Sequence, residues 1–177
     1  NPYDAKGLLK ASIRDNNPVI FMESEVMYSD KGEVPEGEYL LPIGVAEIKR
    51  KGDDVTIVSF GKMMKVAYEA ADELAKDNIH AEVIDLRTVK PIDYPTVIAS
   101  VKKTNRCVIV EEANPVAGLS SDIAYNIQKQ AFDYLDAPVI RVNSMDIPLS
   151  YSPAYIEVTL PNVKRTIDAV KSVTYKK

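Results

Sequence analysis

Residues 81–93 read Ala81-Glu82-Val83-Ile84-Asp85-Leu86-Arg87-Thr88-Val89-Lys90-Pro91-Ile92-Asp93, and this stretch predicts a buried strand, a polar turn and the start of a helix. Val83 and Ile84 are β-branched residues of the kind that fill the core of a sheet. Pro91 cannot continue a strand ladder, because it lacks a backbone N–H group. Asp93 can accept hydrogen bonds from the free N–H groups that open the next helix. The stretch therefore indicates a strand-to-helix crossover.

The same strand-then-helix pattern recurs along the chain. Further strands are expected at residues 55–60, 106–111 and 137–142, each followed by apolar residues at helical spacing. This alternation predicts an α/β fold with three layers, in which a mostly parallel sheet carries helices on both faces. Residues 46–51 are expected to form one antiparallel edge strand near Ile48, and Gly52-Asp53-Asp54 predicts a hairpin turn from it into residues 55–60.

The first residues have a different organisation. Asp4 is expected to cap a helix that carries Leu8 and Leu9, and the apolar residues 19–22 predict a short strand. One helix and one strand cannot form a domain, so residues 1–28 are expected to be the end of a truncated domain. Residues 29–42, rich in charged residues and glycine, then form a linker to a domain at residues 43–177. The first residue is not methionine, which suggests a fragment or a processed chain.

The composition bounds the class of protein. A chain of 177 residues with 46% hydrophobic and 27% charged residues is typical of a soluble globular protein. A net charge of −4 argues against nucleic acid as a partner, because there is no excess of Lys and Arg to neutralise phosphates. No apolar run approaches the ~20 residues of a membrane span. The single cysteine, Cys107, is expected to be a buried strand thiol, which fits a reducing, cytoplasmic compartment.

Few residues offer catalytic chemistry by themselves. The only histidine, His80, lies between a predicted helix end and a strand, where a solvent-facing loop residue is expected. Glu111 and Glu112 end a strand at the edge where ligands of open α/β sheets bind. Adjacent strand residues point to opposite faces, however, so these carboxylates do not form a ready acid–base pair. Ser120-Ser121 predicts helix capping, with anion binding as an alternative.

Longer runs of sequence carry a resemblance to a known family. The chain resembles the carboxy-terminal domain of the transketolase-like thiamine diphosphate enzymes, most closely the beta subunits of pyruvate dehydrogenases. The matching runs are the Asp-Leu-Arg-Thr of residues 85–88 with Pro91 and Asp93, together with residues 4–10, 13–18, 41–44, 100–104, 111–112, 134–138 and 160–163. The resemblance implies a transketolase carboxy-terminal-domain-like fold at residues 43–177, preceded by a remnant of the pyrimidine-binding domain.

The resemblance also implies an activity for the complete enzyme. A heterotetramer of alpha and beta subunits binds thiamine diphosphate and magnesium, decarboxylates pyruvate and acetylates the lipoyl group of a dihydrolipoyl acyltransferase core. The cofactor-activating glutamate and the active-site histidine are expected upstream of Asn1, so the chain alone is expected to be inactive. A mitochondrial matrix location is expected if the source is eukaryotic. The alternatives are the beta subunit of a branched-chain 2-oxo acid dehydrogenase, a sugar-transferring relative and a stand-alone interaction module.

Two sites are implied within the chain itself. The resemblance implies a potassium ion held by backbone or side-chain oxygens of Ser12, Ile13, Asp15 and Asn17, and hard cations prefer such oxygen ligands. A plain helix end with polar capping is the alternative. The resemblance further implies that the subunit-binding domain of the acyltransferase docks on Asp136 and the chain terminus near Lys177, with a solvated acidic loop as the alternative for Asp136.

The chain departs from its family at two of these places. Asn114 stands where many relatives carry an aromatic residue, and the basic Lys176-Lys177 tail differs from the apolar ending of some relatives. The residue roles known in the family therefore apply less directly to the turn after Glu111-Glu112 and to the terminus of this chain.

Overall fold

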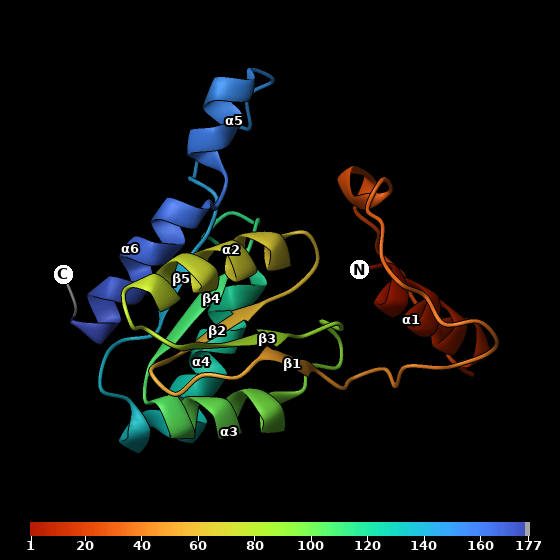
Figure 1. Ribbon diagram of the computed structural model, residues 1–177, viewed down its shortest axis with the longest axis horizontal. Coiled ribbons are helices and arrows are strands. Elements are labelled where there is room, and N and C mark those ends of the chain that lie inside the picture. Colours follow the sequence, from red (N-terminus) through yellow and green to blue (C-terminus); the bar gives the residue numbers. More distant parts are fainter. Residues whose placement is uncertain (176–177) are drawn as a thin grey trace.

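A five-stranded sheet forms the centre of the computed structural model, which describes residues 1–175 (Figure 1). The strand order is β1-β3-β2-β4-β5, and all neighbours are parallel except β1 and β3, which are antiparallel. The strands are β1 Glu47–Arg50, β2 Val55–Ser59, β3 Ala81–Asp85, β4 Cys107–Val110 and β5 Ile140–Val142. The predicted α/β fold, with a mostly parallel sheet and one antiparallel edge strand, is confirmed.

Helices cover both faces of this sheet and give the predicted three layers (Figure 1). One face packs against α2 (Met63–Lys76) and α6 (Val163–Thr174), and the other against α3 (Tyr94–Thr104) and α4 (Leu119–Ala131). Successive residues of a central strand serve the two layers in turn, so Ile57 lies in the first core and Val58 in the second, both fully buried. Each such side chain stabilises the fold by about 1.5–3 kcal/mol.

The crossover at residues 81–93 forms as the sequence predicts. Val83 and Ile84 are fully buried in β3, and the Asp93 side chain caps α3 by accepting from the N–H of Thr96 at 3.1 Å. Asp93 also accepts from the N–H of Ala46 at 3.0 Å. This carboxylate therefore fixes the entry to β1 as well as the start of α3. The fully buried Cys107 lies in β4 as expected, and burial raises the pKa of its thiol.

The predicted hairpin between β1 and β2 is wrong, because β3 lies between these two strands. The connecting turn crosses the start of β3 instead. There the Asp54 carboxylate accepts from the N–H of His80 at 2.6 Å, and the Asp54 N–H donates to the His80 carbonyl at 3.0 Å. A Cβ atom on Gly52 would lie 2.3 Å from the carbonyl carbon of Ala81, so only glycine permits this close crossing. His80 itself is exposed, as the sequence predicts.

The amino-terminal segment differs from expectation in two respects. Helix α1 (Pro2–Arg14) is capped by Asn1, whose side chain accepts from the Asp4 N–H at 2.9 Å, so Asp4 is not the cap. Residues 19–22 form no strand, because no strand among residues 1–175 pairs with them, and the Ile20 side chain is 88% exposed. A single-turn helix, η1 (Glu25–Met27), follows.

The segment that leads from α1 to the sheet folds back along α1 (Figure 1). The rings of Tyr39 and Tyr3 stack with centroids 4.7 Å apart, and the Tyr39 hydroxyl donates to the Tyr3 carbonyl at 2.8 Å. The N–H of Leu41 donates to the carbonyl of Gly7 at 3.2 Å. These contacts give the first residues a defined place beside the domain.

Besides η1, two further short helices in the described part of the chain were not predicted from the sequence. η2 (Phe132–Tyr134) extends α4, and α5 (Pro153–Thr159) lies in an arm that projects beyond the sheet and its helices (Figure 1). The Met145 N–H donates to the Thr159 carbonyl at 2.9 Å, which closes the base of this arm.

Candidate functional site

Glu111 organises the carboxyl end of β4. Its carboxylate accepts from the N–H groups of Leu119 at 2.9 Å and Ser120 at 2.8 Å, which open α4, and from the Asn143 side chain at 3.1 Å. The residue is only 4% exposed. A Cβ atom on Gly118 would lie 2.9 Å from the Glu111 carboxylate, so glycine makes room for this approach. A negative charge at a helix N-terminus satisfies free N–H groups and interacts favourably with the helix dipole.

The predicted capping of α4 by Ser120 and Ser121 is wrong, because Glu111 reaches the helix from a neighbouring strand and leaves these hydroxyls other partners. Ser120 is buried against Asn143, and the Ser121 hydroxyl accepts from Arg141 at 2.6 Å. Local capping patterns did not predict that Glu111 caps α4. The only sequence feature that indicates this cap is a glutamate at the end of a buried strand, eight residues before the helix begins.

Glu112 has a separate role from Glu111. It forms an ion pair with Lys62 at 2.5 Å, and its carbonyl accepts from the Ser144 hydroxyl. The two carboxylates thus serve different neighbours, in agreement with the expectation that they do not form an acid–base pair.

A second polar cluster joins α1 to the sheet. The Arg87 guanidinium pairs with Asp4 at 2.6 Å and with Glu47, and Lys49 pairs with Asp4 at 3.0 Å and also with Glu47. Arg87 has a left-handed backbone with a φ of 57°, and its N–H donates to the Asp85 carboxylate at 2.9 Å. With this backbone conformation, the Arg87 side chain extends toward α1 and reaches Asp4. The sequence pointed to residues 85–88 but not to their partner 83 residues earlier.

Burial and the neighbouring cations have opposite effects on the pKa of Asp4. Burial by itself raises the pKa of Asp4, but Lys49 and Arg87 together outweigh it and hold that pKa below the ordinary value of 3.8. Burial raises the pKa of Asp85, and the nearby Asp4 charge acts in the same direction. Asp4 is therefore the anion that binds the two cations, whereas Asp85 serves mainly as an acceptor for the Arg87 backbone.

A cavity of about 460 Å³ lies beside this cluster, between the amino-terminal segment and the sheet. Its polar wall includes Arg87, Lys49 and Asp85, and its apolar wall includes the buried Leu8 and the half-buried Phe21. Leu9 and Ile20 remain exposed. Of these four apolar residues of the amino-terminal segment, Leu8 and Phe21 therefore line the cavity, whereas Leu9 and Ile20 face water.

We expect Arg87→Met to detach α1 from the sheet, because it leaves the buried Asp4 carboxylate with Lys49 as its one cation, beside the Asn1 side chain of its own helix. Glu47 is partly exposed, so the cost should lie below the roughly 3–5 kcal/mol of a fully buried pair, at about 2 kcal/mol of local stability. Hydrogen exchange of residues 2–14 checks this: protection should fall by about thirtyfold, with β2 and β4 unchanged. The control is Arg14→Met, which removes an exposed ion pair with Glu38. Equal protection in both variants would contradict the role of Arg87.

The same contacts should respond to acid. Since the pKa of Asp4 is depressed in the folded protein, its contribution is complete above the unfolded value near 3.8 and is lost as the pH falls through the lower folded pKa. Acidification of the wild-type chain through this range should therefore lower the hydrogen-exchange protection of residues 2–14, as Arg87→Met does.

The residues expected to hold potassium lie together at the end of α1. Ser12 is in its last turn, and its hydroxyl donates to the Leu8 carbonyl at 2.8 Å. The Asp15 carboxylate accepts from the backbone and side-chain nitrogens of Asn17 at 2.8 and 3.0 Å, and these hydrogen bonds lower its pKa. The Ile13 side chain is exposed. Among residues 1–175, no group of three or more His, Cys, Asp or Glu side chains is placed to hold a metal ion.

Of the two residues expected to bind a partner, only Asp136 can be described. It is 54% exposed in its side chain and forms an ion pair with Arg106 at 2.9 Å. Its carbonyl accepts from the Tyr175 hydroxyl at 3.1 Å, which places the end of α6 beside it. Lys177 lies outside the described residues. No helix in the described part of the chain is long and apolar enough to cross a membrane.

Comparisons with known proteins agree with this architecture. The chain is 52% identical over 179 residues to the pyruvate dehydrogenase E1 component subunit beta of Rhizobium meliloti (strain 1021), covering 99% of this chain and 39% of the relative. It is 46% identical to the acetoin:2,6-dichlorophenolindophenol oxidoreductase subunit beta of Bacillus subtilis (strain 168), covering 98% of this chain and 50% of the relative. The chain thus spans half or less of the length of these relatives.

A solved structure is also similar. It is described as a split gene transketolase, inactive beta4 tetramer, and it matches with a TM-score of 0.68 and 28% identity over 82% of this chain and 47% of that chain. The family described as Transketolase, C-terminal domain, matches residues 44–165, which contain all five strands of the sheet and helices α2 to α5. The chain therefore belongs to the transketolase C-terminal domain family.

Proposed function

We propose that the chain is the carboxy-terminal part of the beta subunit of a pyruvate dehydrogenase, in which it serves subunit assembly and docking. The observation that carries this proposal is the 52% identity to such a subunit across 99% of the chain. In the complete protein, residues 1–28 would end the pyrimidine-binding domain, residues 29–42 would be the linker and residues 43–177 the carboxy-terminal domain.

The complete enzyme would be a thiamine diphosphate- and magnesium-dependent heterotetramer that decarboxylates pyruvate and acetylates a lipoyl group. The described residues do not fit the cofactor, because they offer neither a group of acidic ligands for magnesium nor a glycine-rich phosphate cradle. We therefore place the cofactor site, with its activating glutamate and its histidine, in the part of the subunit upstream of Asn1.

The isolated chain should show no decarboxylation of pyruvate when thiamine diphosphate and magnesium are supplied, because the proposed proton-transfer residues lie upstream of Asn1 and because Glu111 and Glu112 are engaged with α4 and Lys62. Carbon dioxide release from labelled pyruvate checks this, with the complete beta subunit and its alpha subunit as the positive control. Turnover by the purified chain alone would contradict the proposal. A second candidate function is that of an acetoin oxidoreductase beta subunit, which rests on the 46% identity to such a subunit. Activity of the complete enzyme on acetoin, and not on pyruvate, would favour this candidate.

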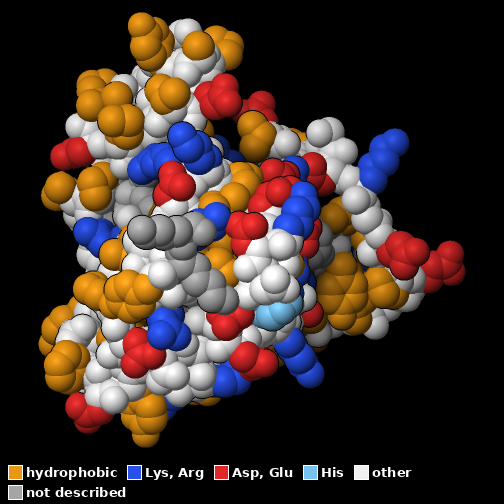
Figure 2. Space-filling model, turned by 60° about the vertical axis from the view of Figure 1, so that its left-hand side comes forward, with side chains coloured by type: hydrophobic (Ala, Val, Ile, Leu, Met, Phe, Trp, Pro, Cys, Tyr) orange, Lys and Arg blue, Asp and Glu red, His pale blue; other side chains and the backbone are white. Residues whose placement is uncertain are grey.

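Exposed apolar side chains support a role in subunit assembly. Hydrophobic side chains gather at the top of the molecule over the α5 arm (Figure 2), where Leu149, Tyr151, Tyr155 and Val158 are all exposed. Apolar patches of this kind mark protein interfaces. We assign the arm and the exposed side chains of residues 13–28 to contacts with the upstream domain, the alpha subunit and a second beta subunit.

We place a potassium site at Ser12, Ile13, Asp15 and Asn17, whose side-chain and backbone oxygens suit a hard cation. Potassium should then increase the hydrogen-exchange protection of residues 8–17 relative to tetramethylammonium at equal ionic strength. Asp15→Asn should weaken the apparent affinity several-fold, and Glu33→Gln should leave it unchanged. If potassium, relative to tetramethylammonium, raised the protection of residues 8–17 equally in Asp15→Asn and Glu33→Gln, the proposed site would be contradicted.

The compartment follows the source of the protein. Relatives include bacterial subunits and one from Oryza sativa subsp. japonica that is described as mitochondrial. We propose a cytoplasmic location in a bacterium and the mitochondrial matrix in a eukaryote.

A further inference from the structure

Within residues 1–175, strand β5 leaves one edge of the sheet unpaired. It is the last strand in the order β1-β3-β2-β4-β5 and pairs only with β4, and the Val142 carbonyl accepts from the Glu111 N–H at 3.1 Å. In a parallel ladder, alternate residues bond to the same neighbour. The backbone groups of Ile140 and Val142 thus face β4, whereas those of Arg141 face outward. The outward N–H and C=O groups of Arg141 offer a pairing point for another extended chain, beside the Asn143 carbonyl that Arg165 occupies.

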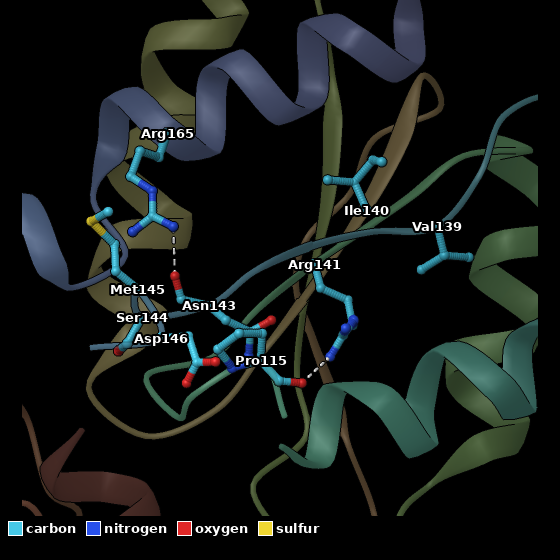
Figure 3. A pocket seen from close by; sticks show the side chains of 9 residues that line it. All are labelled: Pro115, Val139, Ile140, Arg141, Asn143, Ser144, Met145, Asp146 and Arg165. Carbon is cyan, nitrogen blue, oxygen red and sulfur yellow. Dashed lines mark hydrogen bonds between the residues drawn. The ribbon is translucent and has the colours of Figure 1, made fainter. Parts of the chain in front are cut away.

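A cavity of about 420 Å³ runs along this edge (Figure 3). Its walls include the consecutive residues Val139, Ile140 and Arg141 of the edge itself, with Arg165 and Asp146 at one end. Two arginines against one aspartate give the cavity a positive balance of charge. A negatively charged segment is therefore the complementary occupant.

The two arginines are held in place on opposite faces of the sheet. Arg141 donates to the Pro115 carbonyl at 3.0 Å and to the Ser121 hydroxyl at 2.6 Å, on the face covered by α4. Arg165, from α6, donates to the Asn143 carbonyl at 2.6 Å (Figure 3). Each guanidinium has five N–H donors, and these hydrogen bonds use only some of them. Because the cations lie on opposite faces, they do not converge on one small anion.

We propose that the free edge of β5 binds an extended acidic segment of a partner polypeptide, which adds a sixth strand to the sheet. Side chains of an extended segment alternate between the two faces, so acidic residues an odd number of positions apart reach Arg141 and Arg165 together. A second copy of this chain fits less well, because pairing of two β5 edges about a two-fold axis brings the Arg141 side chains of both copies to one edge. This interaction lies beyond the proposed assembly and docking roles.

Fluorescence anisotropy with the full chain tests this proposal. The probe is a labelled, end-blocked peptide of valine and threonine with two glutamates three positions apart. It should bind at least about tenfold more tightly than the same peptide with lysines, and several-fold more tightly than one with its glutamates four positions apart, which share one face. Methylation of alternate backbone amides on one strand edge should abolish binding, because it removes the ladder hydrogen bonds.

Variants of the chain complete the test. Arg141→Glu should weaken glutamate-peptide binding by about tenfold or more and favour the lysine peptide, and Arg141→Gln, which can still donate to Pro115, should weaken it less. Lys164→Glu, the same charge change at the exposed neighbour of Arg165, is the matched control. Equal binding of the glutamate and lysine peptides, or binding insensitive to amide methylation, would overturn the proposal. A dimer that Arg141→Glu dissociates, without peptide binding, would assign the edge to a second copy instead.

Discussion

Replacement of Glu111 by alanine should lower the free energy of unfolding by about 3 kcal/mol, the largest effect we expect from a polar side chain of this fold. The substitution removes an acceptor from two N–H groups that open α4 and from the Asn143 side chain; the hydrogen bonds of Ser120 and Asn143 are buried and that of Leu119 is partly buried. A buried donor without a partner costs about 1–3 kcal/mol, and loss of a helix cap alone costs about 1 kcal/mol. The cost should be felt by the whole domain, because α4 covers one face of the sheet.

Denaturant unfolding monitored by circular dichroism checks this prediction. Its control is the adjacent Glu112→Ala, which removes a partly exposed ion pair with Lys62 and should cost less than about 1 kcal/mol. Glu111→Gln should fall between the two, since the amide keeps one acceptor oxygen. Equal stabilities of the two alanine variants would show that the Glu111 cap does not hold α4 to the sheet.

Local sequence patterns predicted the elements of the domain but not all of their neighbours. The buried strand is predicted by Val83 and Ile84, and the helix cap by Asp93. Both can be recognised locally, because burial periodicity and capping depend on residues that are close in the sequence. The pairing of β1 with β3 was missed, because a turn such as Gly52-Asp53-Asp54 serves equally for a hairpin and for a crossing over a third strand. Strand order is set by contacts that a local pattern does not contain.

The polar contacts that position the candidate sites were missed for the same reason. Asp4 looked like a helix cap from its place in the sequence, but it is the buried partner of Lys49 and Arg87. Glu111 looked like a strand end, but it caps a helix. In both cases a carboxylate finds donors that are distant in sequence, and the free energy of burying it selects these partners over the local ones. The strand expected at residues 19–22 failed because a strand needs a neighbour with which to pair.

Asp136→Lys should weaken binding of the acyltransferase subunit-binding domain by about a hundredfold, or about 2.7 kcal/mol. We propose that the subunit-binding domain presents a basic surface to the acidic Asp136. Asp136 already pairs with Arg106, so the substitution places two cations side by side where this basic surface would dock. The melting temperature should change little, because an exposed ion pair contributes at most about 1 kcal/mol. Asp133→Lys makes the same charge change three residues earlier at an exposed position of η2 and should leave the affinity nearly unaltered.

Titration calorimetry of the chain with the subunit-binding domain of a dihydrolipoyl acyltransferase tests the central claim most directly. The domain that we propose at residues 43–177 contains the whole described sheet, and helices α2, α3, α4 and α6 cover both faces, so it should present the docking surface without the upstream part of the subunit. We predict measurable binding that weakens as salt is raised toward physiological ionic strength, where charges are screened over about 8 Å, and that Asp136→Lys largely removes. Absence of binding at low salt by a folded chain, or binding that Asp136→Lys and Asp133→Lys leave equally strong, would contradict the assignment of this chain as the docking part of a pyruvate dehydrogenase beta subunit.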